Sequence, residues 1–209
     1  RAKRLLPALF VVMAATIPFS WLWMLPTQHE SYAQSLVYVS LFVSNILFWK
    51  ESGYFSLEAE EKPLLHTWSL AVEEQYYLLF PLLVVFLWRF GRSPSTIVIS
   101  VIAVLSLWLS QWGSTNKPDA NFYLLVSRAW EILLGSLCAL SVLNKPKVGN
   151  DFIAGVGLLL IWVAIFLFDE SVPMPSVYGL VPVIGTGLVL LYATEGTYVA
   201  KLLSSRAMV

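Results

Sequence analysis

Apolar segments of about the length of a membrane-spanning helix recur along this chain, and they constrain its fold more than any other feature. A helix needs ~20 predominantly apolar residues to cross a bilayer, with ~17 as the lower end. Six runs meet that requirement, at residues 5–25, 64–88, 96–112, 122–143, 152–168 and 177–193. The composition is 58% hydrophobic and 12% charged, far from that of soluble domains. The sequence therefore predicts an all-α membrane protein, a polytopic helix bundle.

A seventh apolar run, at residues 36–49, is short and contains polar side chains, so charge placement must decide whether it spans. If it crosses the membrane, the later basic pairs lie opposite the basic N-terminus. If it enters and leaves on one side, they share the N-terminal side, as the positive-inside rule requires. These pairs are Arg89 with Arg92, Lys145 with Lys147, and Lys201 with Arg206. We predict six spanning helices plus one re-entrant or surface-lying short element, with the N-terminus in the cytoplasm.

Charge and cysteine content exclude several classes of function. The formal net charge is zero, which leaves no broad basic surface for nucleic acid. The single cysteine, Cys138, precludes an internal disulfide and argues against a thiolate metal site. No metal site is predicted. The sequence also lacks the phosphate-loop, dinucleotide, nucleophile-elbow and zinc-protease motifs of soluble enzymes.

Polar side chains interrupt the run at residues 64–88, where a plain anchor would carry Leu or Val. On a helix, His66, Ser69 and Glu73 fall at i, i+3 and i+7 and share one face. A charged group in hydrocarbon costs on the order of 3 kcal/mol unless it is paired or wet, so by default it marks a functional site. For His66 alone, catalysis or substrate binding and an ordinary hydrogen-bonded role are equally good interpretations.

A second pair of charges lies in the run at residues 122–143, where Arg128 and Glu131 are spaced i, i+3. In the predicted orientation both reach a depth similar to that of Glu73. One interpretation is an ion pair that only holds the bundle together. Because a structural bundle has little use for this many buried ionisable groups, the sequence favours a functional site.

Arg1, Lys3 and Arg4 open the first run at the cytoplasmic surface. Two arginines three residues apart share a helix face and can bind phosphate through paired hydrogen bonds. Control of topology needs no more than these charges. From the residues alone, topology control is the better interpretation of this cluster.

The string "LLHTWSLAVEEQYYLLFPLL" resembles acyltransferase family 3, the integral-membrane O-acyltransferases that modify bacterial cell-surface glycans. The stretches "RAKRLLPAL", "LFVSNILFWKESGYF" and "FYLLVSRAWEILLGSL" agree with it in order and spacing. The resemblance implies a single ten-helix acyltransferase domain in the bacterial inner membrane, surrounded by membrane lipids. Residues 1–209 would supply its third through eighth helices, as a piece of a longer protein.

The resemblance also implies the chemistry. An acyl group, usually acetyl, would pass from acyl-CoA to a hydroxyl of a lipid-linked or surface polysaccharide, such as a lipopolysaccharide O-antigen sugar. The family's R-x-x-R motif, associated with the donor, falls on Arg1 and Arg4, which favours a CoA-binding role for them. Its H-x-W-S-L-x-V-E element runs from His66 to Glu73.

The family's catalytic histidine belongs to a helix that precedes Arg1, so we expect the main base outside residues 1–209 and this piece alone to be inactive. Glu73, Arg128 and Glu131 would hold the base, the acceptor or the developing charge, with His66 on the acceptor side. The alternative function is a transporter that moves a glycan or an anionic solute through the same polar-lined bundle. A transporter would need no CoA site beside Arg1.

Overall fold

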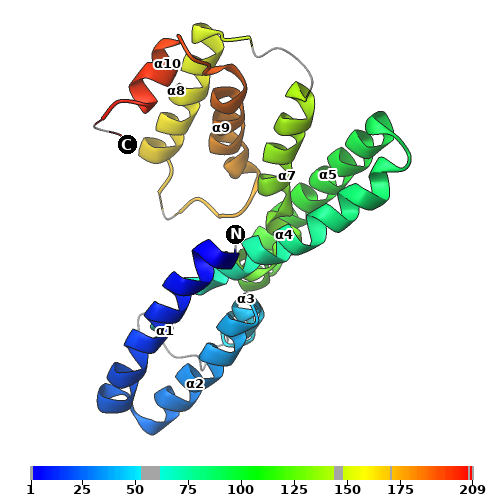
Figure 1. The fold of residues 1–209 in the computed structure, drawn as a ribbon. Coiled ribbons are helices and arrows are strands. Elements are labelled where there is room, and N and C mark those ends of the chain that lie inside the picture. The colour runs from blue at the N-terminus through cyan, green and yellow to red at the C-terminus, as the bar shows by residue number, and fades with distance from the viewer. Residues whose placement is uncertain (1, 53–61, 144–147, 170, 207, 209) are drawn as a thin grey trace. The chain divides into compact units, whose positions relative to one another are not determined.

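The structure is a computed structural model that describes residues 2–52, 62–143, 148–169, 171–206 and 208. Within these ranges the chain is helical and forms no strand, which confirms the all-α prediction (Figure 1). The elements in chain order are α1 (Ala2–Trp23), α2 (Pro26–Ser40), α3 (Ser44–Lys50), α4 (Thr67–Trp88), α5 (Arg92–Asn116), α6 (Pro118–Tyr123), α7 (Leu125–Val142), α8 (Asp151–Leu167), η2 (Val177–Gly179), α9 (Leu180–Tyr192) and α10 (Tyr198–Leu203).

Among the described residues, four helical stretches are long and apolar enough to cross a membrane. They are Lys3–Trp23, Thr67–Trp88, Arg92–Asn116 and Pro118–Val142, the last of which joins α6 to α7. The other two predicted spans correspond to shorter apolar helices, Asp151–Leu167 and Val177–Tyr192. At 1.5 Å per residue, 17 residues reach about 25 Å, a little less than the ~30 Å hydrocarbon core. The four long apolar helices support the predicted membrane protein, and the count of six spans stays a prediction.

The run at residues 36–49 is divided between two helices. α2 begins ten residues earlier than that run, at Pro26, and α3 begins at Ser44 after a break. At the break Phe42 has a φ of 55°, an uncommon backbone conformation for a residue other than glycine. Its carbonyl oxygen accepts a hydrogen bond from Gln75 Nε2 at 3.0 Å. Irregular backbone at membrane depth is tolerated where protein satisfies its polar groups, so the break suits the predicted short element.

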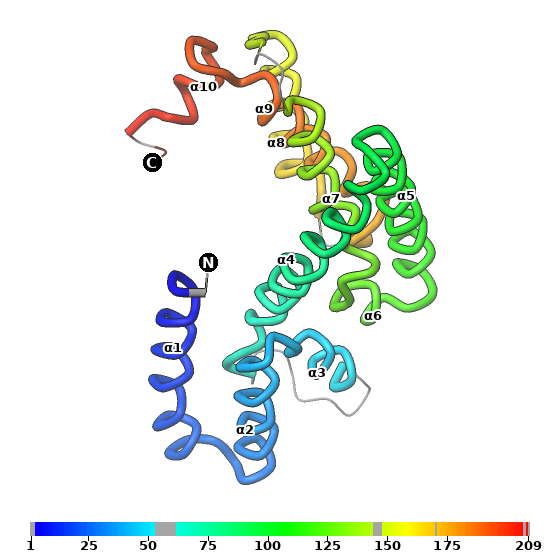
Figure 2. Tube along the Cα trace, turned by 45° about the vertical axis from the view of Figure 1, so that its right-hand side comes forward, coloured from blue at the N-terminus to red at the C-terminus, as the bar shows by residue number. Residues whose placement is uncertain are grey.

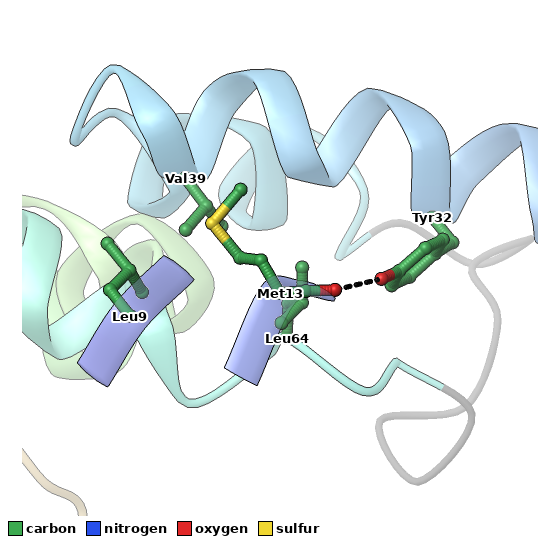
Figure 3. Close-up of a cluster of buried hydrophobic side chains, with 5 residues drawn as sticks. All are labelled: Leu9, Met13, Tyr32, Val39 and Leu64. Carbon is green, nitrogen blue, oxygen red and sulfur yellow. Dashed lines mark hydrogen bonds between the residues drawn. The ribbon is translucent and has the colours of Figure 1, made fainter. Parts of the chain in front are cut away.

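Helices α1 and α2 run side by side as a hairpin (Figure 2). Leu9 and Met13 of α1 pack with Tyr32 and Val39 of α2 and with Leu64, which precedes α4 (Figure 3). Polar contacts reinforce this core. The Tyr32 hydroxyl lies 2.6 Å from Thr16 Oγ1 and donates to the Met13 carbonyl oxygen at 3.4 Å. Ser20 Oγ lies 2.7 Å from His29 Nδ1, nearer the turn.

The chain divides into two compact units. Unit 1 comprises Arg1–Leu82 with Tyr123–Leu125, and unit 2 comprises Leu83–Phe122 with Val126–Val209. Unit 1 contains the α1–α2 hairpin, α3 and most of α4. In unit 2, α8 packs against α9 at paired glycines, a close approach typical of membrane helices.

Candidate functional site

The polar residues His66, Ser69 and Glu73, called the stripe below, lie exposed at the start of α4. Thr67 is the first helical residue, so His66 lies in the preceding turn, and its carbonyl oxygen accepts a hydrogen bond from Ser69 Oγ at 3.2 Å. The side chains of His66, Ser69 and Glu73 are exposed, as is Tyr77 one turn further along. Tyr76 is instead buried and stacks on Phe80, so it is a packing aromatic. The exposure of these side chains agrees with the predicted shared face, although His66 precedes the helix on which the spacing argument placed it.

Gln75 belongs to a partly buried hydrogen-bond network between α4 and α3, which we call the clasp. Its Nε2 donates to Asn45 Oδ1 at 2.8 Å as well as to the Phe42 carbonyl oxygen. Asn45 Nδ2 in turn donates to the Tyr123 carbonyl oxygen at 3.1 Å. About two helical turns before Gln75, Thr67 Oγ1 donates to Ser44 Oγ at 3.1 Å. Amide and hydroxyl groups therefore fix the face of α4 that lies away from the stripe.

Glu74 lies to one side of the stripe in the spacing argument and was not among the predicted site residues. It is half-buried, and its Oε1 atom is buried without a hydrogen-bond partner among the residues that the structure describes. An unsatisfied buried carboxylate oxygen is costly. Periodicity could not single it out, because Glu73 and Glu74 are adjacent and both fall near the predicted stripe.

Arg128 and Glu131 form the predicted i, i+3 pair, with Nη1 and Oε2 3.8 Å apart and with side chains 20% and 30% exposed. Arg128 also donates from Nε to the Phe122 carbonyl oxygen at 2.8 Å, and its guanidinium carbon lies 4.9 Å from the centre of the Phe122 ring. Both charges lie within the apolar stretch Pro118–Val142. The pairing is confirmed, whereas its convergence with Glu73 on a single site stays a prediction.

The proposed donor motif is described only in part. Arg4 lies in the first turn of α1 with an exposed side chain. Arg1 lies outside the described residues, as do Lys145 and Lys147 of the topology argument. The described ranges bring together no group of three or more His, Cys, Asp or Glu side chains that could hold a metal ion.

Comparison with known proteins gives a family match over nearly the whole chain. The model of acyltransferase family 3, described as an acyltransferase domain, matches residues 1–202. An uncharacterized protein of Haemophilus influenzae is 30% identical over 91% of this chain and 83% of its own length. A putative membrane-bound transacylase, BcsY of Komagataeibacter xylinus, is 26% identical over 84% of this chain. The O-acetyltransferase OatA of Staphylococcus aureus is 35% identical over 82% of it.

The matched region is only part of two of these relatives. It covers 45% of BcsY and 30% of OatA. No solved structure matches the chain.

Proposed function

The chain belongs to acyltransferase family 3, and from that premise we propose that the complete protein is a membrane-bound O-acyltransferase acting on a bacterial cell-surface glycan. The donor is acyl-CoA, most simply acetyl-CoA, and the acceptor is a sugar hydroxyl of a polysaccharide or a lipopolysaccharide O-antigen. The protein resides in the inner membrane with the start of α1 at the cytoplasmic side. The relatives OatA, named as an O-acetyltransferase, and BcsY, named as a putative transacylase, support this class of reaction.

The observation that carries the proposal is the exposed stripe on α4. Ser69 and Glu73 are polar, yet they project from a helix apolar enough to cross a membrane, and His66 lies in the turn just before it. A carboxylate in that position cannot face lipid without a large cost, so the stripe lines a polar cavity or faces another polar segment. Such a cavity is what a transfer reaction on a hydrophilic sugar requires.

Transfer to a hydroxyl needs a base to take the proton and a group that stabilises the oxyanion. The main base is a histidine outside residues 1–209. Glu73 orients that base or the acceptor, and His66 binds on the acceptor side. Arg128 and Glu131 place a fixed charge pair in the bundle near the developing charge.

The donor site is assigned to Arg1 and Arg4 at the cytoplasmic end of α1. Guanidinium groups bind phosphate through paired hydrogen bonds, which suits the phosphates of CoA. The exposed side chain of Arg4 is available for that contact.

The experiment is a complementation assay with the full-length gene. The O-acetyl content of surface polysaccharide is measured by mass spectrometry in deleted cells and in cells that carry the wild type or the double substitution of Arg1 and Arg4 by Ala. We expect O-acetyl groups to vanish on deletion, to return with the wild type, and to stay absent with the well-expressed variant. If acetylation is unchanged on deletion while export of the glycan falls, the protein is a transporter and not the proposed enzyme.

A further inference from the structure

The turn between α4 and α5 carries two arginines, Arg89 and Arg92, to which the proposed reaction gives no role. The turn joins two helical stretches that could each cross a membrane, Thr67–Trp88 and Arg92–Asn116. At 1.5 Å per residue, their 22 and 25 residues reach about 33 and 38 Å, more than the ~30 Å hydrocarbon core. Whichever side of the membrane the turn occupies, both arginines therefore lie at the level of the lipid headgroups.

Arg92 is bound within the protein. Its Nη2 atom donates to the carbonyl oxygen of Leu140, in the last turn of α7, and to that of Leu143, just after the helix, at 3.1 Å. The last carbonyl groups of a helix lack intrahelical partners, and a basic side chain can satisfy them. Arg92 therefore joins the start of α5 to the end of α7 and has a structural role.

Arg89, three residues earlier, has a different environment. Its side chain is exposed, and its guanidinium carbon lies 5.8 Å from the centre of the Phe86 ring and 5.7 Å from that of Phe90. The two rings meet edge to face, with their centres 5.7 Å apart. Among the described residues no carboxylate forms an ion pair with Arg89. A guanidinium has five N–H donors, and contact with ring faces leaves donors available to an acceptor outside the protein.

Hydrogen bonds hold the backbone of this turn. Ser95 is buried, and its Oγ lies 2.9 Å from the carbonyl oxygen of Leu87 and 2.7 Å from that of Gly91. Gly91 has a φ of 97°, a backbone conformation that favours glycine. Because the turn is already ordered, a ligand that binds Arg89 would not have to order the backbone, which lowers the entropic cost of binding.

A phospholipid matches this surface in both of its parts. Its phosphate can accept paired hydrogen bonds from a guanidinium, and its acyl chains can cover the exposed rings of Phe86, Trp88 and Phe90. A zwitterionic headgroup would bring its own ammonium group close to Arg89, so a headgroup with a net negative charge fits better. We propose that Arg89, held by Phe86 and Phe90, binds the phosphate of an anionic phospholipid. The inference rests on the membrane-spanning helices and not on the acyltransferase reaction.

The test measures lipid binding to the purified full-length protein in detergent. The probes are dioleoylphosphatidylglycerol, which is anionic, and dioleoylphosphatidylcholine, which has the same acyl chains and no net charge. Native mass spectrometry gives the Kd of each lipid. Arg89→Gln removes the proposed contact. Lys117→Gln, the matched control, removes one positive charge from an exposed side chain at the other end of α5. Inorganic phosphate and CoA, added at constant ionic strength, compete if the site prefers a soluble phosphate.

We expect the wild type and Lys117→Gln to bind phosphatidylglycerol more tightly than phosphatidylcholine. Arg89→Gln should bind phosphatidylglycerol about fivefold more weakly, as for the loss of one basic side chain beside an anionic lipid surface. Its binding of phosphatidylcholine should not change. Arg92→Gln should keep the lipid preference but lower the melting temperature, because carbonyl groups at the end of α7 lose their donor. Neither CoA nor inorganic phosphate should displace the lipid.

Three outcomes overturn the inference. The wild type may show no preference for phosphatidylglycerol, or Arg89→Gln may bind that lipid as Lys117→Gln does. The third is displacement of the lipid by CoA or inorganic phosphate, which would assign Arg89 to a soluble phosphate ligand. Failure of the proposed acyltransferase reaction would leave these lipid affinities unchanged, because none of them depends on acetyl transfer.

Discussion

Arg128 Nε donates to the carbonyl oxygen of Phe122 at 2.8 Å, across the break between α6 and α7. The carbonyl groups of the residues on either side of Phe122 also accept hydrogen bonds from side chains. Ser127 Oγ donates to the Asn121 carbonyl oxygen at 2.7 Å, and Asn45 Nδ2 donates to that of Tyr123. The last carbonyls of a helix lack intrahelical partners. Side chains therefore satisfy the end of α6, and Arg128 has a structural role besides any catalytic one.

Replacing Arg128 should show both roles. Arg128→Lys keeps the charge but lacks the planar guanidinium that reaches the Phe122 carbonyl while it also faces Glu131. Loss of a hydrogen bond from a charged donor should lower the free energy of unfolding by about 1–3 kcal/mol. The melting temperature of the full-length protein in detergent measures this effect, and surface O-acetylation should fall in the same variant.

A double substitution separates structure from chemistry at this pair. Arg128→Met with Glu131→Leu removes both charges, and apolar replacements of a buried ion pair are often tolerated. We expect near-normal expression with acetylation abolished. A variant that folds and acetylates normally would show that acetyl transfer does not need the Arg128–Glu131 pair.

The clasp between α3 and α4 should contribute to stability through Gln75. Gln75→Leu leaves the Phe42 carbonyl without its side-chain donor at the break and removes the partner of Asn45. An unsatisfied buried polar group costs about 1–3 kcal/mol, so the melting temperature should fall. Gln34→Leu, at an exposed position of α2, is the matched control and should change little.

The same clasp allows a double-mutant cycle with Asn45→Leu. Because the two amides share hydrogen bonds, the destabilisation of the double variant should be smaller than the sum of the single effects, by about 0.5–3 kcal/mol. Additive effects would show that the two amides act independently.

How far the sequence predicted this arrangement depends on the range of the interactions. Local spacing was enough to predict the Arg128–Glu131 pair, because it follows from helical periodicity. The same periodicity placed His66 on the helix with Ser69 and Glu73, but α4 begins one residue later, at Thr67. The start of α2 was missed, since Pro26 to Ser35 is mostly polar and an apolar-run criterion passes over it.

The role of Gln75 could not be predicted from local pattern. Its partner Asn45 is 30 residues away, and Asn45 reaches Tyr123 over 78 residues. The side chains of Tyr32, Phe48 and Lys62, which line one small pocket, likewise come from three separate segments. Contacts of this kind depend on tertiary packing, which no window of a single sequence contains.

The adjacent carboxylates of α4, Glu73 and Glu74, should have different roles. Glu73 is exposed on the stripe, so Glu73→Gln should abolish acetylation without loss of protein. Glu74 has a buried, unsatisfied oxygen, so Glu74→Gln removes a buried charge and should raise the stability, by about 1 kcal/mol, with acetylation retained. Mass spectrometry of surface glycan and melting curves check the two results. The reverse pattern, with Glu74→Gln inactive and Glu73→Gln active, would transfer the functional role to Glu74.

From the packing of α8 against α9 we expect different effects of alanine at two glycines of α8, Gly157 and Gly155. A Cβ atom added at Gly157 would lie 2.7 Å from the carbonyl oxygen of Gly185 and 2.9 Å from Leu188 Cβ. A backbone carbonyl cannot rotate away as a side chain can, so Gly157→Ala should force the helices apart and cost about 1–3 kcal/mol.

At Gly155 an added Cβ meets nothing within 4 Å. Gly155→Ala should therefore be neutral or should stabilise α8 by up to about 1 kcal/mol through helix propensity. Melting temperatures of the two full-length variants, measured in the same detergent, give the comparison. Equal effects at the two positions would contradict the close crossing of α8 and α9, because only Gly157 faces the backbone of its neighbour.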